Sequence, residues 1–175
     1  TTLFRSSVCR YPLSAVLSPH LAARAEGVSV DPARIRQTVI DAAKTADVVL
    51  VEGAGGAAVE IREGYSFVDL ARDLSLPVLI VAGNRLGVLN HLKLTLSYLR
   101  SEGISLFGVI LNDLTPEPFF ARESNEAEVR RIAGNCYLGR IPYGTPLLPD
   151  EVFSRFGRIL QRIVNHSSFP DLKRH

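Results

Sequence analysis

Runs of consecutive apolar residues alternate along the chain with segments in which apolar residues recur every three or four positions. The runs are typical of strands buried on both faces, and the periodic segments are typical of amphipathic helices. Strands that alternate with helices predict an α/β fold with a parallel sheet and helices on both faces. The predicted strands are residues 48–51, 77–83, 106–113 and 136–142.

Local signals mark the ends of the predicted helices. Asp31 can cap a helix that opens at Pro32, because aspartate oxygens accept from free backbone N–H groups and proline tolerates the first turn. Ser18 and Pro19 open a shorter helix in the same way, and Gly27 stops it. Further helices are predicted over residues 65–76, 88–103, 123–133 and 150–164.

The composition indicates one globular domain, residues 1–175, with 46% hydrophobic and 22% charged residues. The net charge is +2 and the basic residues are scattered, which argues against binding to nucleic acid or an anionic membrane surface. No apolar run approaches the ~20 residues that a membrane helix needs, and no signal peptide is recognisable. We expect Cys9 and Cys136 to be free thiols and the protein to be cytoplasmic.

Polar and glycine-rich stretches follow several predicted strands, and ligands bind beyond the carboxyl ends of strands in such sheets. We therefore expect one shared site. Glu52 directly follows residues 48–51, where an acidic side chain commonly holds Mg²⁺ or a water near a nucleotide phosphate. The glycines that follow let the backbone approach an anion closely. A tight turn in which Glu52 bonds to its neighbours would explain the same residues.

Two further stretches suggest chemistry of their own. Gly87 begins a helix whose free N–H groups suit a carboxylate or phosphate, and Asn84 or Asn90 could add a contact. An ordinary helix cap is the alternative. Asn112 and Asp113 end the third predicted strand, where an amide can pair with the edge of a purine. An Asx-turn would account for this pair as well.

Five stretches occur in an order that resembles the dethiobiotin synthetases, ATP-dependent enzymes of biotin biosynthesis: LSPHLAA, VLVEGAGG, LPVLIVAGNRLGVLNH, GVILND with TP one residue later, and LGRIP. The resemblance extends from about Leu17 to Asp150. It implies a fold like that of P-loop NTPases, a homodimer, and Mg²⁺ with ATP. It also implies a reaction in which 7,8-diaminopelargonate and CO₂ form a carbamate, ATP phosphorylates it, and the second amine closes the ring of dethiobiotin.

The resemblance implies binding roles for two sets of residues. Glu52 would help to coordinate Mg²⁺. The ATP site would comprise Glu52, Gly53, Ala54, Gly55, Asn112, Asp113, Pro142, Tyr143 and Gly144, with the adenine between Asn112–Asp113 and Pro142–Gly144. The substrate-binding residues would be Gly56, Gly87, Val88, Leu89 and Asn90, and the helix start at Gly87–Asn90 would cross the dimer interface and bind the substrate carboxylate of the other subunit. Asp150 matches a further acidic contact to the nucleotide only with a one-residue shift.

The chain departs from the family pattern at its beginning. The motif G-x-x-x-x-G-K-[ST], which cradles phosphates and supplies a lysine and a Mg²⁺-binding hydroxyl, does not occur. The family's catalytic lysines and second acidic Mg²⁺ ligand lie upstream of the matched region, so we assign no catalytic residue. The chain also contains no methionine and begins at Thr1.

From this we expect the N-terminal βα units to be missing. A chain without the phosphate loop and without a central strand is expected to be inactive and marginally stable. Dethiobiotin formation by the purified chain would contradict this expectation.

Two alternatives remain open. The chain could be a non-catalytic domain of the same fold that binds a nucleotide or a protein partner, since the phosphate loop is missing. It could also be an amidotransferase domain of cobalamin synthesis, because such domains share the VEGAGG stretch. That second interpretation is weaker, since neither cysteine lies in a nucleophile elbow. Thermal protection by Mg-ATP together with diaminopelargonate would favour the synthetase over a binding domain.

Overall fold

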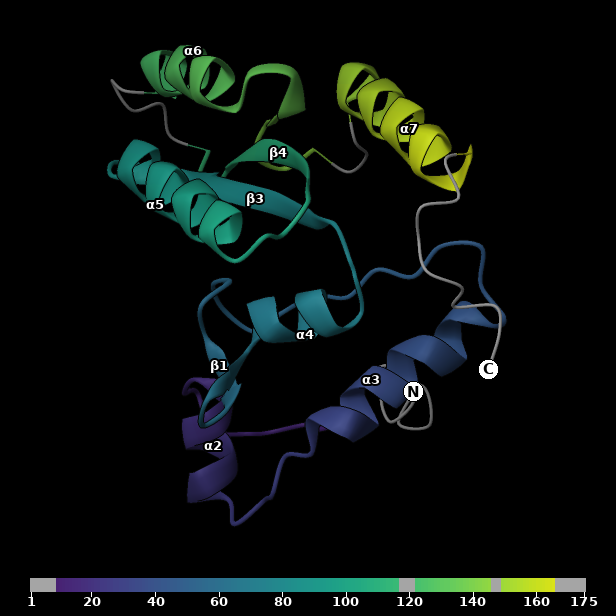
Figure 1. The fold of residues 1–175 in the computed structure, drawn as a ribbon. Coiled ribbons are helices and arrows are strands. Elements are labelled where there is room, and N and C mark those ends of the chain that lie inside the picture. The colour runs from purple at the N-terminus through teal and green to yellow at the C-terminus, as the bar shows by residue number, and fades with distance from the viewer. Residues whose placement is uncertain (1–8, 117–121, 146–148, 166–175) are drawn as a thin grey trace. The chain divides into compact units, whose positions relative to one another are not determined.

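The computed structural model describes residues 9–116, 122–145 and 149–165 of the chain (Figure 1). Its contacts divide the chain into two compact units, one that extends to Leu76 and one that begins at Pro77. Each unit is described by itself, and the single domain inferred from the composition stays a prediction. No helix within the described ranges is long and apolar enough to cross a membrane.

The second unit is built on a parallel sheet of three strands. These are β3 (Val78–Asn84), β4 (Leu106–Asp113) and β5 (Tyr137–Ile141), and β4 lies in the middle. The register pairs Asn112 of β4 with Gly83 of β3 on one side and with Ile141 of β5 on the other. The three strands that the sequence predicts in this unit are confirmed, and their carboxyl ends lie next to one another.

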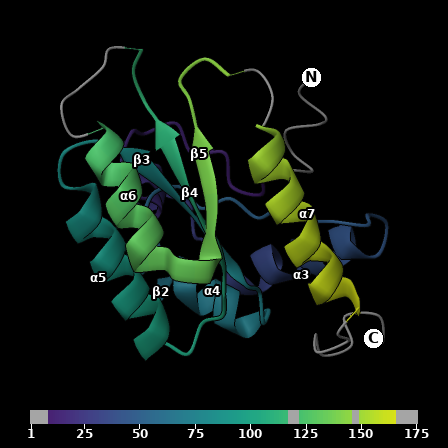
Figure 2. The same ribbon diagram turned by 90° about the horizontal axis from the view of Figure 1, so that it is seen from above.

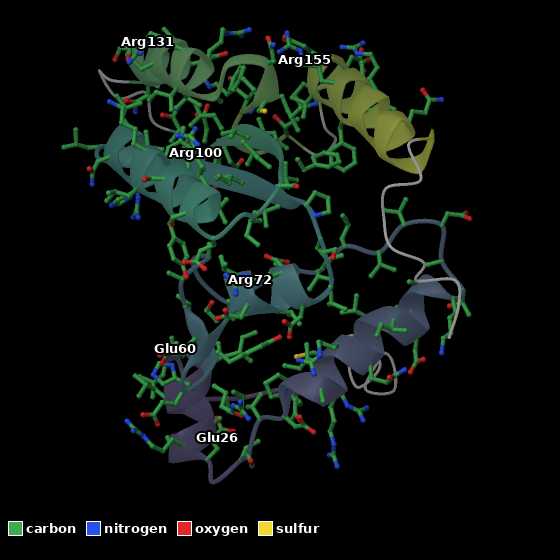
Figure 3. All side chains as sticks on the ribbon, in the orientation of Figure 1. Glu26, Glu60, Arg72, Arg100, Arg131 and Arg155 are labelled. Carbon is green, nitrogen blue, oxygen red and sulfur yellow. The ribbon has the colours of Figure 1, made fainter. Side chains whose placement is uncertain are left out.

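Helices cover both faces of this sheet, as predicted (Figure 2). The helices α5 (Val88–Ser101) and α6 (Arg122–Ala133) pack on one face, and α7 (Asp150–Asn165) packs on the other. A 3-10 turn, η1 (Gly134–Cys136), joins α6 to β5. Exposed arginines such as Arg100 of α5 and Arg131 of α6 mark the solvent side of the helices (Figure 3).

The central strand supplies residues to two cores, one on each face of the sheet. Val109 and Leu111 of β4 face α5 and α6, whereas Phe107 and Ile110 face α7. The core on the side of α5 and α6 also contains Val88, Leu92, Val129 and Tyr137. The core on the side of α7 also contains Leu138 and Val152. Because β4 is buried on both faces, its apolar run has no alternation of polar residues.

In its described residues, 9–76, the first unit contains three helices and a short hairpin. The helices are α2 (Pro19–Ala25), α3 (Pro32–Ala43) and α4 (Phe67–Asp73), and the hairpin pairs β1 (Glu60–Arg62) with β2 (Tyr65–Ser66) in antiparallel fashion. One cluster of buried apolar residues in this unit comprises Ala23, Val30, Ile61, Leu70 and Leu74. The sequence patterns did not predict the hairpin, which turns at Gly64 with φ +73°.

The helix-start signals are mostly confirmed. The side chain of Asp31 accepts a hydrogen bond of 2.9 Å from the backbone N–H of Ala33, as expected for a cap. Ser18 occupies the cap position of α2, but its side chain makes no capping hydrogen bond and instead lies 3.4 Å from Nδ1 of His20. The sequence therefore predicted the cap position of α2 correctly, but the expected capping hydrogen bond from Ser18 is not formed.

The strand predicted at residues 48–51 is wrong. These residues form no strand in the structure, and the side chains of Val48 and Leu50 are 51% and 79% exposed. A buried parallel strand exists only where neighbouring strands bond to its N–H and C=O groups. Within the described part of the first unit, the only sheet is the β1–β2 hairpin, so the apolar run has no strand beside it.

Replacement of Gly139 by alanine should destabilise the second unit. Gly139 has φ +141°, and a Cβ at this position would lie 2.6 Å from Cγ2 of Val152. We expect Gly139→Ala to lower the free energy of unfolding by about 3 kcal/mol, because backbone strain and overpacking add. Gly157→Ala in α7 is the matched control, because a Cβ at this position would meet no atom within 4 Å. It should raise the free energy of unfolding by roughly 0.5 kcal/mol. Urea unfolding followed by circular dichroism measures both, and equal effects would contradict the packing argument.

Ser66 forms a capping box at the start of α4 that should make stability depend on pH. Its Oγ accepts from the N–H of Asp69 and donates to Oδ2 of Asp69 at 2.6 Å, and its own N–H donates to the same oxygen at 2.7 Å. These bonds lower the pKa of Asp69 below its usual 3.8, so their stabilisation is present above that pH and is lost as the pH falls through the folded-state pKa.

We expect Ser66→Ala to lower the free energy of unfolding by about 1 kcal/mol at pH 7, and by less below pH 4. Urea unfolding at both pH values measures this difference. Ser97→Ala, on the exposed side of α5, is the control and should show no such change with pH. A loss of equal size at both pH values would contradict the role of the Asp69 carboxylate.

Candidate functional site

The carboxyl ends of the three strands of the second unit form one edge, at which several sequence-predicted residues meet. Asn84 ends β3, Asp113 ends β4, and the register pairs these two residues directly. β5 ends at Ile141, which lies beside Asn112, and Pro142 follows directly in the chain. The parallel pairing therefore brings Asn112–Asp113 and the start of Pro142–Gly144 together.

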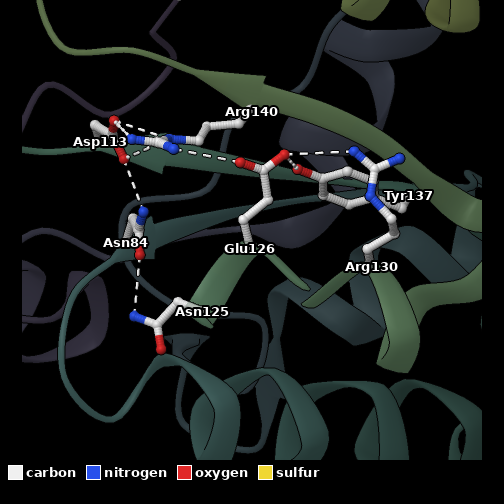
Figure 4. Close-up of polar contacts among 7 residues, drawn as sticks. All are labelled: Asn84, Asp113, Asn125, Glu126, Arg130, Tyr137 and Arg140. Carbon is white, nitrogen blue, oxygen red and sulfur yellow. Dashed lines mark hydrogen bonds and ion pairs between the residues drawn. The ribbon is translucent and has the colours of Figure 1, made fainter. Parts of the chain in front are cut away.

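A buried carboxylate, that of Asp113, organises this edge (Figure 4). Its side chain is 2% exposed. The guanidinium of Arg140 donates to Oδ2 from both Nε (3.0 Å) and Nη2 (2.8 Å), and Asn84 Nδ2 donates to Oδ1 at 2.8 Å. Asn125 Nδ2 in turn donates to Oδ1 of Asn84 at 3.0 Å. Since a buried charge is costly unless it is paired and hydrogen-bonded, Asp113 depends on these partners.

The network continues from Arg140 onto α6. Arg140 Nη1 lies 3.3 Å from Oε2 of Glu126, and the hydroxyl of Tyr137 donates to Oε1 of Glu126 at 3.1 Å. The guanidinium of Arg130 lies over the ring of Tyr137, 4.7 Å from its centroid. Burial raises the pKa of Tyr137, and the carboxylate of Glu126 raises it further, so the phenol keeps its proton and donates.

Asn112 points away from this network. Successive side chains of a strand face opposite sides, so the half-buried Asn112 lies on the α7 face while Asp113 lies on the α6 face. The sequence-predicted residues Pro142, Tyr143 and Gly144 follow β5 in a turn. Its carbonyl at Pro142 accepts from Oγ1 of Thr145 at 2.8 Å, and Gly144 has φ +70°. Tyr143 is 54% exposed, so its ring is open to a ligand.

The predicted helix start is confirmed. Gly87 caps α5 with φ +91°, and the helix runs for 14 residues from Val88. The first N–H groups of an α-helix have no partner within the helix, and here they belong to Val88, Leu89 and Asn90. The N–H of Val88 donates to the carbonyl of Arg85 at 3.1 Å, which leaves Leu89 and Asn90 as the donors for a ligand. Asn90 is exposed at this end, whereas the amide of Asn84 is buried and bonded to Asp113 and Asn125. Of the two asparagines considered for an anion contact, Asn90 is thus the accessible one.

The loop after residues 48–51 belongs to the first unit, and packing explains part of its glycine content. A Cβ on Gly53 would lie 3.0 Å from the ring of Phe67, and Gly55 has φ +110° with Val59 close by. Gly56 has open space around it and an ordinary φ, so neither reason applies there. Glu52 and Ala54 are exposed. The turn explanation accounts for Gly53 and Gly55, and it leaves Glu52 and Gly56 without a packing role.

The residues that the structure describes could supply only some of the ligands of a metal ion. Within the described ranges, no three His, Cys, Asp or Glu side chains are grouped to bind an ion. Mg²⁺ commonly takes one or two protein carboxylates and completes its octahedron with water and substrate phosphates. The exposed carboxylate of Glu52 suits that arrangement.

Sequence reasoning missed five members of the network: Asn125, Glu126, Arg130, Tyr137 and Arg140. One signal was available for Arg140, which is the only charged residue in an otherwise apolar predicted strand. Arginine is rarely buried without a partner, so this position called for an acidic residue nearby. The choice of Asp113 and Glu126 as that partner depends on the tertiary fold.

Loss of the Asp113 charge should destabilise the second unit. We expect Asp113→Asn to lower the free energy of unfolding by about 3 kcal/mol, because the guanidinium of Arg140 would lose its close charged partner and keep the longer contact to Glu126. Glu128→Gln is a matched control, since it neutralises a carboxylate in an exposed pair with Arg131 of the same helix and should change little. Urea unfolding measures both. Similar losses in the two variants would show that the network contributes no special stability.

Comparison of the sequence with known proteins places the chain in a family. Residues 5–150 match the family model described as AAA domain. An ATP-dependent dethiobiotin synthetase of Aromatoleum aromaticum is 42% identical over 142 residues, which are 81% of this chain and 63% of that protein. The enzyme of the same name from Anaeromyxobacter dehalogenans is 38% identical over 78% of this chain and 61% of its own length.

A third relative of that name, from Anoxybacillus flavithermus, is 35% identical over 84% of this chain and 67% of its own length. The chain thus spans less than two thirds of the first two relatives. The matched range and these identities show that the chain belongs to the AAA domain family and is a homologue of the ATP-dependent dethiobiotin synthetases.

Proposed function

We propose that this chain is the nucleotide- and substrate-binding part of an ATP-dependent dethiobiotin synthetase. In the proposed reaction, 7,8-diaminopelargonate and CO₂ are converted to dethiobiotin as ATP is hydrolysed. The observation that carries the proposal is the position of Asn112, the second-last residue of the central strand, beside the turn at Pro142–Gly144. The chain's similarity to the named relatives supports the choice of reaction.

Asn112 is suited to bind the adenine. Its amide offers one acceptor and two donors, which match the N6 amino group and N7 of adenine, whereas guanine presents two acceptors there. The half-buried position limits competition from water. Pro142, the exposed Tyr143 and Gly144 would flank the base, since their turn begins beside Asn112. The strand end at Asp113 completes this part of the site.

The loop at Glu52 would contact the phosphates. In this proposal Glu52 is a ligand of Mg²⁺, and Gly53, Ala54 and Gly55 present backbone to the nucleotide. Bound Mg²⁺ would neutralise charge on the phosphates during transfer to the carbamate. Glu52 is exposed and has no packing role, which supports its assignment to a ligand.

The start of α5 would bind the carboxylate of diaminopelargonate. Leu89 and Asn90 would offer N–H groups at the positive end of a helix dipole, and Gly87 brings no side chain to block them. Val88 would line the site without donating, because its N–H bonds to the carbonyl of Arg85. Gly56 would line the same substrate. We further propose that the protein is a homodimer in which this helix start serves the site of the other subunit.

The proposed chemistry needs orientation more than it needs reactive side chains from this chain. One amine of the substrate attacks CO₂ and forms a carbamate, which takes the γ-phosphoryl group of ATP. The second amine then attacks the carbamoyl carbon, and phosphate leaves as the ring closes. The residues named above would hold the adenine and the carboxylate at fixed places, which lowers the entropic barrier to both attacks.

The decisive test is nucleotide binding and its dependence on Asn112. Mg-ATP should raise the melting temperature of the chain, and diaminopelargonate should raise it further, because each ligand binds only the folded state. Asn112→Ala should weaken ATP binding about 10-fold, in keeping with the ~1–3 kcal/mol that a bidentate base contact provides. Asn135→Ala, at an exposed position in η1, is the control and should bind ATP like the original chain.

The outcomes separate the candidate functions. No response to ATP would contradict the proposal. A response to ATP without one to diaminopelargonate would favour a non-catalytic nucleotide-binding domain. Isothermal titration of ATP, GTP and the diamine into each variant gives the affinities.

A further inference from the structure

Asp113 cannot contact a base in the structure as it stands. Its side chain is 2% exposed, and both carboxylate oxygens already accept hydrogen bonds, from Asn84 and from the fork of Arg140. Asn112, the neighbour that can reach a base, faces the other side of the sheet. Asp113 must therefore act through other residues if it affects nucleotide binding.

Arg140 connects the parts of the chain that would hold the adenine. It lies in β5, one residue before Ile141, the register partner of Asn112, and two residues before Pro142. Its guanidinium binds the last residue of β4 and reaches Glu126 of α6 (Figure 4). Arg140 thus links β4, which carries the amide of Asn112, to β5, which leads into the turn at Pro142–Gly144.

Stability alone is a weak reason for such a network. A buried ion pair often stabilises a protein no more than apolar residues of the same size would, because both charges lose their hydration. A two-pronged arginine–carboxylate contact does, however, define the distance and the angle between the two groups. The contact between Asp113 and Arg140 therefore sets the geometry of the two strand ends.

Resting on the proposed function, we infer that Arg140 is a positioning residue for nucleotide selection. Through Asp113 and Glu126, it holds the amide of Asn112 and the turn at Pro142–Gly144 at the spacing that adenine requires. Arg140 itself does not touch the nucleotide. Discrimination between adenine and guanine depends on the alignment of one amide, and an error of about 1 Å in such an alignment can cost up to 100-fold.

Arg140→Lys tests this inference because it keeps the positive charge and removes the fork. We expect the affinity for ATP to fall about 10-fold while the weaker affinity for GTP changes little, so that the ratio of the two affinities falls. Arg131→Lys is the matched control, since Arg131 pairs with Glu128 on the exposed side of α6 and should leave the ratio unchanged. Glu126→Gln is a second variant in which the fork stays intact, and its ratio should fall by less.

A second measurement does not depend on nucleotide binding. The chain contains no tryptophan, so Tyr143→Trp places a single fluorescent reporter in the turn. In this background, Arg140→Lys should lower the fluorescence anisotropy of the reporter without nucleotide, because the turn loses its connection to β4. Arg131→Lys should leave the anisotropy unchanged.

The two measurements together separate a positioning role from a purely structural one. If Arg140→Lys lowers both the affinity ratio and the anisotropy, the inference is supported. If the variant melts at a lower temperature but keeps the ratio of the original chain, the network is only structural and the inference is overturned. If the original chain binds neither ATP nor GTP, the proposed function fails, and with it the selection of adenine. A lower anisotropy in Arg140→Lys would still support the positioning of the turn.

Discussion

The pairing of β4 with a parallel strand on each side is the constraint on which the second unit depends. It buries β4 on both faces, so that Val109 and Ile110 contribute to different cores. It also places Asn112 beside Gly83 and Ile141, which brings three loops to one edge. Every polar residue discussed in this unit takes its place from that register, because a shift of one residue would turn each side chain to the other face.

The second constraint on the fold is that the charged residue at the end of a buried strand needs hydrogen-bond donors. Asp113 lies where water is excluded, and a carboxylate in such a place needs donors from its own protein. Arg140, Asn84 and Asn125 supply or orient those donors from three different elements. The tertiary structure of the strand ends is therefore tied to electrostatics as much as to apolar packing.

The sequence predicted the second unit well because its signals are local. Each of its three strands is largely apolar, with Arg140 as the one charged residue inside β5, and Gly87 marks the start of α5 through a backbone conformation that glycine favours. The failure at residues 48–51 has a physical reason, since apolarity indicates a tendency to be buried but does not supply a neighbouring strand. The β1–β2 hairpin was missed because strands of three and two residues carry little periodicity.

The candidate site was predictable in part. Chain position alone pointed to Asn112 and Asp113, and the register explains why they meet the turn at Pro142. Their different tasks could not be read from the sequence, because they follow from the face of the sheet to which each side chain points. Glu52 and the glycines after it remain predictions that rest on resemblance and on exposure.

The exposed run at residues 48–51 gives its acidic neighbours a second significance. Four consecutive β-branched or aliphatic residues, largely open to solvent and without a strand beside them, are a template for self-association into intermolecular sheets. Asp47 and Glu52 bracket this run, and their like charges repel a second copy that approaches in register. The charge of Glu52 would therefore oppose such self-association, whatever ligand the residue binds.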